Sequence, residues 1–134
     1  MRYFSFIAAF AVLMVSCHTF DEKDVIISDL NPLGWEEGQP VVLRYRNEDT
    51  VSLRRISLIV RRQKGIDESL NVSIRSVTPD QIYFTESMIL DMNVEITPYR
   101  NDVILSRAGE YAFIISPPAG EPVRGLLAIG VVIE

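Results

Sequence analysis

The sequence predicts an all-β fold, a single antiparallel β-sandwich of the immunoglobulin-like or jelly-roll-like kind. Two observations support this prediction. From Val25 onward, apolar and polar residues alternate with a period of two over short runs, and turn-forming residues separate these runs. No segment after Val25 shows the 3.6-residue period of an amphipathic helix, so the crossover helices that a parallel sheet requires are missing.

Each expected strand ends at a recognisable turn signal, such as Asn31-Pro32, Thr78-Pro79-Asp80 or Pro117-Pro118. In chain order, the expected strands are Val25–Leu30, Val41–Tyr45, Ile56–Val60, Leu70–Ile74, a segment from Ile82 and Phe84 into the long run Met88–Ile96, then Tyr111–Ile115 and Leu127–Ile133.

Two of these strands carry more detailed expectations. Met88–Ile96 is the longest regular alternation, and the segment Thr97–Asp102 is expected to end it. In the strand near residue 130, we expect four residues to share one face, namely Leu127, Ile129, Val131 and Ile133.

The segment Leu105–Phe113 contains the pattern L-x-x-x-G-x-Y-x-F. It is similar to a tyrosine corner, in which a tyrosine hydroxyl bonds to nearby backbone where the chain enters a strand. Tyr111 is therefore expected to serve the fold rather than a binding site.

Residues 1–16 have the layout of a signal peptide that is cleaved, with Arg2 followed by an apolar run too short to cross a bilayer. The run ends in Leu13-Met14-Val15-Ser16-Cys17, which resembles a bacterial lipobox, where a lipidated cysteine becomes the mature N-terminus. A plain signal peptide with Cys17 as an incidental thiol is the alternative. The predicted organisation is an N-terminal signal helix over residues 1–16, a lipidated tether over 17–24 and the sandwich over 25–134.

Composition excludes several classes of function. The net charge of −5 becomes −6 once Arg2 is removed with the signal, which argues against nucleic acid as a partner. One cysteine and one histidine are too few for a His/Cys zinc site or a His-dependent catalytic triad. The sequence also lacks Gly-rich phosphate loops and a nucleophile elbow. We therefore expect no enzymatic activity, no metal and no cofactor.

Two features are candidate interaction sites, and each has a structural alternative. Trp35, the only tryptophan, lies between two glycines and is either an exposed aromatic platform or a plug over one end of the core. Basic charge concentrates around residues 44–64, and it marks either an acidic partner or a solvated strand face. The candidate basic residues are Arg54, Arg55, Arg61 and Arg62.

Several of these features together resemble the GldH family, gliding-motility-associated lipoproteins of Bacteroidota. The resemblance rests on Cys17, on Trp35 before an alternating strand, on the basic strand Arg54–Arg62, on Gly109-x-Tyr111-x-Phe113, and on the ending Leu126–Glu134. The segment Arg62–Ile66 departs from the family pattern, which usually has an arginine and aromatic residues there. The resemblance implies a non-enzymatic component or assembly factor of the motility and secretion machinery.

The expected protein is thus held in the cell envelope by lipid on Cys17, at the outer membrane, facing either the periplasm or the surface. Its expected partners are other envelope proteins. The alternative function is glycan binding, with Trp35, Tyr99 or Tyr83 as stacking platforms.

Overall fold

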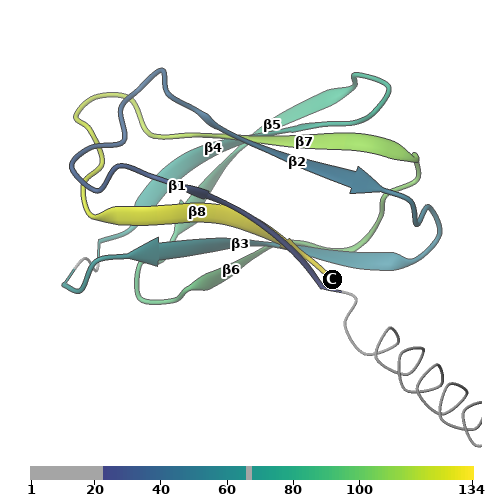
Figure 1. Ribbon diagram of the computed structural model, residues 1–134, viewed down its shortest axis with the longest axis horizontal. Coiled ribbons are helices and arrows are strands. Elements are labelled where there is room, and N and C mark those ends of the chain that lie inside the picture. The colour runs from purple at the N-terminus through teal and green to yellow at the C-terminus, as the bar shows by residue number, and fades with distance from the viewer. Residues whose placement is uncertain (1–22, 66–67) are drawn as a thin grey trace, which may run out of the picture.

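The computed structural model describes residues 23–65 and 68–134, which form two antiparallel four-stranded sheets packed face to face. Figure 1 shows the two layers, with β2, β7, β4 and β5 in one and β1, β8, β3 and β6 in the other. The all-β sandwich is confirmed. The strands are β1 (Asp24–Asp29), β2 (Val41–Asn47), β3 (Leu53–Arg62), β4 (Leu70–Val77), β5 (Tyr83–Leu90), β6 (Ile96–Ile104), β7 (Gly109–Ser116) and β8 (Leu126–Ile133).

The strand order is that of a jelly roll rather than an immunoglobulin domain. The sheets have the orders β1-β8-β3-β6 and β2-β7-β4-β5. β1 pairs with β8, β2 with β7, β3 with β6 and β4 with β5, so the chain is one long antiparallel ribbon rolled over itself. Rolling also brings β3 beside β8 and β4 beside β7, which completes the two sheets.

The period-two alternation predicted from the sequence directs one face of each sheet into the core. In β4, Val72 and Ile74 are buried, while Asn71 and Arg75 on either side of this pair are exposed. The same pattern places Tyr111, Phe113 and Ile115 of β7 in the core, as predicted. Side chains from the two inner faces therefore interdigitate to form the core, as is usual for stacked sheets.

The expectations for residues 88–102 are wrong in two respects. The alternation of Met88–Ile96 does not form one strand, because β5 ends at Leu90 and a turn follows. In this turn the Asp91 carboxylate accepts a bond of 2.9 Å from the backbone N–H of Asn93, and Val94 N–H donates to the Asp91 carbonyl. Asp and Asn favour such turns because their side chains bond to nearby backbone.

The segment expected to break the strand, Thr97–Asp102, instead lies within β6. Pro98 is tolerated because β6 is an edge strand of its sheet, where one side of the backbone needs no hydrogen-bond partner. The pairing of β6 with β3 is irregular, with register shifts on either side of Ile56.

Leu127 also departs from its predicted place. It is 41% exposed, whereas Ile129, Val131 and Ile133 are buried in the core. The pairing of β3 with β8 shifts between Arg61 and Arg62, so that Arg61 opposes Ala128 and Arg62 opposes Leu126. This bulge skips Leu127 and reverses the side-chain alternation at that point.

β1 lies very close to β8 at Gly130. A Cβ at this position would lie 2.3 Å from the Ile26 carbonyl oxygen and 2.8 Å from the Ile27 Cα. Gly130 pairs directly with Ile27, so only a residue without a side chain permits this approach of the two backbones.

The predicted signal peptide and Cys17 lie outside the described residues, as does most of the predicted tether. Asp24, the last tether residue by our prediction, is already in β1 and pairs with Ile133. None of residues 23–65 or 68–134 forms a helix with the length and apolar character that crossing a membrane requires.

We predict that Gly130→Ala lowers the free energy of unfolding by about 1–3 kcal/mol, because the added methyl group must displace the β1 backbone. Denaturant unfolding of the variant would measure this loss. Asn71→Ala, at an exposed position of β4, is the control and should change stability by less than about 0.5 kcal/mol. Equal stability of both variants would show that β1 moves away from β8 at no cost.

Candidate functional site: the groove between β5 and β6

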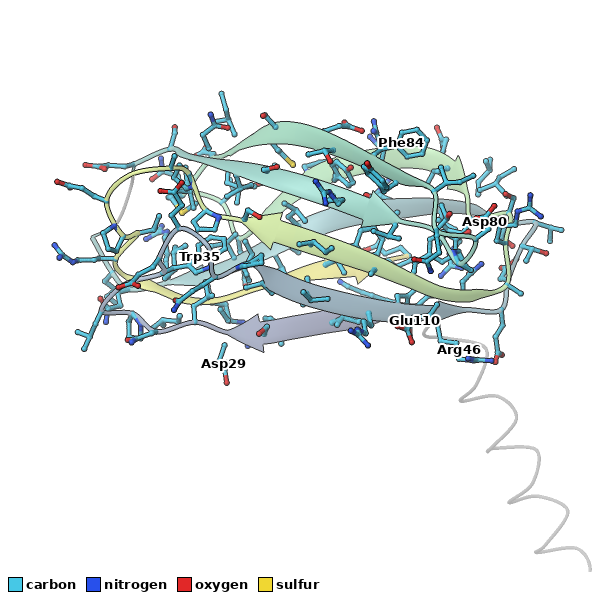
Figure 2. All side chains as sticks on the ribbon, turned by 90° about the horizontal axis from the view of Figure 1, so that it is seen from above. Asp29, Trp35, Arg46, Asp80, Phe84 and Glu110 are labelled. Atoms are coloured by element: carbon cyan, nitrogen blue, oxygen red, sulfur yellow. The ribbon has the colours of Figure 1, made fainter. Side chains whose placement is uncertain are left out.

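The two long sides of the sandwich differ. β1 and β2 pack against each other along one side, whereas β5 and β6 make at most marginal contact along the other. Figure 2 shows Phe84 on the β5 side and Asp29 on the opposite long side, with Trp35 at one end. The sandwich is therefore closed at β1 and β2 and open at β5 and β6.

A groove of about 490 Å³ occupies this open side, and we call it the β5/β6 groove. More than half of its lining residues are apolar or aromatic. The lining consists of Ile56, Ser76, Thr78, Asp80, Ile82, Phe84, Glu86, Tyr99, Arg100, Val103, Ile104, Leu105, Ser106, Arg107, Tyr111 and Phe113.

Three large apolar side chains of the groove are strongly exposed. Phe84 is 60% exposed, Ile82 is 52% exposed and Ile104 is 48% exposed. Ile82 and Phe84 lie on the β5 wall and Ile104 at the end of β6, so both walls present apolar surface.

Two polar contacts cross the groove from one sheet to the other. Arg100 of β6 forms an ion pair with Glu86 of β5. The hydroxyls of Tyr99 and Ser76 lie 3.3 Å apart, which joins β6 to β4. The ion pair is partly exposed and stabilises the fold by about 0–1 kcal/mol. These contacts hold the two walls at a defined separation.

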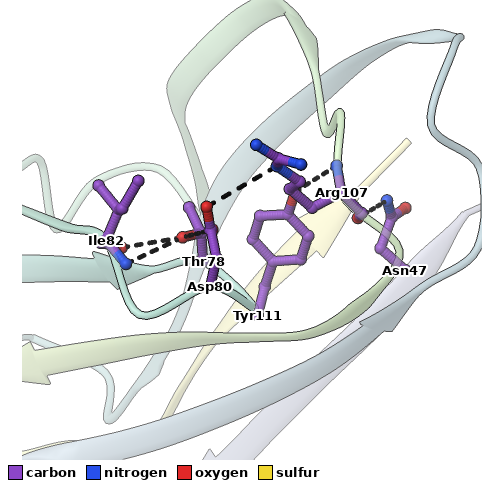
Figure 3. A network of polar contacts seen from close by, with 6 residues as sticks. All are labelled: Asn47, Thr78, Asp80, Ile82, Arg107 and Tyr111. Atoms are coloured by element: carbon purple, nitrogen blue, oxygen red, sulfur yellow. Dashed lines mark hydrogen bonds and ion pairs between the residues drawn. The ribbon is translucent and has the colours of Figure 1, made fainter.

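One end of the groove is built by a network of hydrogen bonds (Figure 3). The backbone N–H of Arg107 donates to the Tyr111 hydroxyl at 3.1 Å, so the predicted tyrosine corner is confirmed. Asn47 is fully buried and its amide donates to the carbonyls of Leu105 and Arg107 at 2.9 and 3.0 Å. The two bonds from Asn47 fix the segment between β6 and β7 against the end of β2.

Asp80 belongs to the same end of the groove. It forms an ion pair of 3.8 Å with Arg107 and accepts a bond from the Thr78 hydroxyl, which itself accepts from Ile82 N–H. The bond from the Thr78 hydroxyl and a bond from a backbone N–H lower the pKa of Asp80; burial raises it by less than these bonds lower it, and the charge of Arg107 lowers it by a smaller amount. Asp80 is therefore a firmly ionised carboxylate at neutral pH.

Trp35 lies in the core at the end of the sandwich, with 3% of its surface exposed. Its indole N–H donates to the Gln39 carbonyl at 2.8 Å, and its backbone forms a β-bridge with Val123. This is the plug position that the sequence offered as the alternative to an exposed platform.

The four candidate arginines do not form one surface. Arg54 is 9% exposed and donates to the Glu134 carbonyl, to Asn47 and to Tyr45, so it joins β3 to β2 inside the fold. The other three are on the surface. Arg55 pairs with Glu134 at 3.8 Å, Arg61 pairs with Glu95 at 3.7 Å, and Arg62 donates to the Gln63 carbonyl.

The two tyrosines considered for stacking are each partly covered. The guanidinium of Arg75 lies 5.0 Å from the ring centre of Tyr83, and that of Arg100 lies 4.9 Å from the ring centre of Tyr99. Tyr99 also packs against the core, whereas Tyr83 is 61% exposed on the outer face of β5. Each ring thus already has a cation on one face.

Sequence reasoning did not single out Phe84, Glu86 or Arg100. These residues line the groove because β5 and β6 lie opposite each other in the two sheets. The two strands are joined in the sequence by a short turn. One local signal was present, since Tyr83-Phe84 places two aromatic rings on opposite faces of a strand directly after the Thr78–Asp80 turn.

Comparison of the chain with protein-family models, with curated proteins and with solved structures returned no match.

The lowered pKa of Asp80 leads to a prediction about pH. A carboxyl group whose pKa is lower in the folded than in the unfolded state stabilises the fold at pH values above its ordinary pKa of 3.8. This stabilisation is lost as the pH falls through the folded-state pKa. We therefore expect Asp80→Asn to lower the melting temperature at neutral pH, and the difference from the parent to disappear in acid. A difference that stays constant with pH would contradict the linkage.

Proposed function

We propose that the protein is a non-enzymatic, lipid-anchored protein of the cell envelope that binds other envelope proteins through the β5/β6 groove. This proposal includes the resemblance to GldH-like gliding-motility lipoproteins, with lipid on Cys17 as the anchor. The observation that carries it is the open side of the sandwich, where two apolar walls face each other over the core. Exposed apolar grooves of this kind are typical of binding surfaces.

The charges of the groove indicate what kind of partner fits it. Its two carboxylates and two guanidinium groups are paired with each other, Asp80 with Arg107 and Glu86 with Arg100. The groove therefore offers no unpaired charge to an ionic ligand. The chemistry that fits is an uncharged segment of a protein that presents apolar side chains to Phe84, Ile82 and Ile104.

The same contacts favour a protein over a glycan. Sugar binding by stacking needs open aromatic faces, but Trp35 is buried and the rings of Tyr83 and Tyr99 each have an arginine over one face. Phe84 is then the strongly exposed ring that lines the groove. Paired carboxylates also support a non-enzymatic role. A general acid needs a raised pKa, whereas that of Asp80 is lowered.

The start of β1 is compatible with an anchor at Cys17. Lys23 and Asp24 lie at one end of the sandwich, beside Glu134 and the β2–β3 loop. The β2–β3 loop follows Asn47, which bonds to the carbonyls of Leu105 and Arg107, so the hydrogen-bond network at one end of the groove lies at this same end of the sandwich.

Replacing Cys17 tests the anchor. We expect the parent protein to fractionate with membranes and to incorporate a labelled fatty acid, and Cys17→Ala to be released or mislocalised. His18→Ala is the neighbouring control and should behave as the parent. Membrane retention with acyl labelling in Cys17→Ala would contradict lipidation at this residue.

A crosslinking pull-down from native envelopes, read by mass spectrometry, tests the groove. Ile82→Lys and Ile104→Lys place a charge on each apolar wall, and a change of about 2 kcal/mol at such a contact weakens binding about thirtyfold. We expect both variants to lose the captured envelope protein. Leu33→Lys and Val51→Lys change residues that are each 79% exposed but do not line the groove, and they should retain it.

Two results would overturn the proposed contact surface. The first is capture of the same envelope proteins by the groove variants and the controls alike. The second is recovery of bulk outer-membrane proteins only, together with binding of the parent protein to a glycan array.

A further inference from the structure

We infer that two copies of this chain associate through the free edge of β5, which extends the β2-β7-β4-β5 sheet across a two-fold axis. The inference goes beyond the proposed function, because it concerns the backbone edge of β5 and depends neither on lipid nor on a groove partner. The strands that end the two sheets are β1 and β6 in one sheet and β2 and β5 in the other.

Edge strands expose unpaired backbone groups, so proteins usually protect them with charge, proline, bulges or short length. Three of the four edges are protected. β1 has six residues with an aspartate at each end, β2 carries Arg44 and Arg46, and β6 contains Pro98 and irregular register. In addition, β1 and β2 pack against each other on the closed side.

β5 is the least protected of the four edges. Its eight residues contain no proline, lysine or arginine, and its register with β4 is regular from Leu70↔Leu90 to Val77↔Tyr83. Its one charged residue is Glu86, which is already paired with Arg100. The outer side of β5 also presents Ile89, which is 68% exposed, and Tyr83, which is 61% exposed.

The backbone groups at the free edge can be assigned from the hairpin that precedes β5. Thr78 N–H donates to the Ile82 carbonyl, so the backbone of Ile82, directly before β5, faces β4. Because hydrogen-bonded pairs alternate in an antiparallel ladder, the backbone groups of the odd-numbered residues face outward. These residues are Tyr83, Thr85, Ser87 and Ile89.

A second β5 can satisfy these groups in only a few registers. With a two-fold axis perpendicular to the sheet, each residue of one β5 opposes a residue of the other β5 whose side chain lies on the same face of the sheet. In such a register one residue must oppose its own copy, and the axis passes between these two copies. Centring on Thr85 or Met88 pairs only five strand residues, and centring on Glu86 opposes two carboxylates. Centring on Ser87 pairs Phe84 to Leu90, seven of the eight strand residues, without opposing like charges.

The side chains in the Ser87-centred register are complementary. On the inner face, Phe84 opposes Leu90 and Glu86 opposes Met88; on the outer face, Thr85 opposes Ile89 and Ser87 opposes itself. Aromatic and β-branched cross-strand pairs stabilise sheets. Because the axis is perpendicular to the sheet, the two β5/β6 grooves face each other across it, so the dimer and a groove-bound envelope protein are alternative states.

Disulfide formation between engineered cysteines tests both the edge and the register in the full-length chain. Ser87→Cys places two thiols on opposed residues whose Cα atoms are about 5.5 Å apart, within the range a disulfide spans. Thr85→Cys, which is also exposed on the same face, is the matched control, because its two copies are displaced by about 14 Å along the strands. The parent chain controls for the thiol of Cys17.

We expect mild oxidation to give a covalent dimer with Ser87→Cys, and neither Thr85→Cys nor the parent to exceed background. Equal crosslinking of Ser87→Cys and Thr85→Cys would overturn the register. A crosslinked product whose mass differs from twice the chain would assign the edge to another protein, and would also overturn the inference.

Sedimentation of the full-length chain in detergent solution tests association without engineered thiols. We expect a concentration-dependent dimer, and a rise of about tenfold or more in its dissociation constant with Ile89→Lys, because lysine on an edge opposes strand addition. Asn71→Lys, on β4 directly beside Ile89 but away from the edge, should leave the dissociation constant unchanged. A parent chain that stays monomeric at every concentration overturns the inference.

Discussion

The placement of β8 between β1 and β3 is the interaction on which the rest of this structure depends. β1 has no other partner within its sheet, and β3 would otherwise pair only with β6. β8 therefore holds the first sheet together, and its residues Ile129, Val131 and Ile133 also supply much of that sheet's buried surface. Gly130 is the point where this arrangement is tightest, since β1 approaches it so closely that no side chain fits.

The two long sides of the sandwich differ although they are built alike, each from two consecutive strands that belong to different sheets. β1 and β2 pack against each other and close one side, whereas β5 and β6 make at most marginal contact and leave the other side open. The open side would expose core residues such as Phe113 and Ile56 to water if nothing crossed it. The Glu86–Arg100 and Ser76–Tyr99 contacts are the polar bridges there, and they leave an apolar groove between them.

The strands with a simple two-residue alternation could be predicted from the sequence because one face of each packs in the core, as Val72 and Ile74 show. The prediction failed at residues 91–94, where Met92 is 2% exposed although it lies in a turn, so its apolar character continued the alternation past the end of β5. It failed at Pro98 because a proline interrupts a strand that hydrogen-bonds to neighbours on both sides, whereas β6 has a neighbour on one side only.

The groove could not be predicted in this way. The groove depends on which strand edges lie apart in space, and the alternation of residues within one strand does not predict this. Arg54 illustrates the same limit, since its neighbour Arg55 is exposed and nothing in the sequence shows that Arg54 reaches Tyr45 and Asn47 inside the fold.

The pairing of β1 with β8 has a mechanical consequence. β1 starts at Asp24 and runs antiparallel to β8 through six paired residues, from Asp24↔Ile133 to Asp29↔Ala128. Tension that enters the domain at Asp24 along the strand axis loads these pairs in shear, so that they resist together instead of opening one after another. Force applied at the start of β1 would thus pass through the β1–β8 pair, in which Gly130 lets the two backbones approach closely.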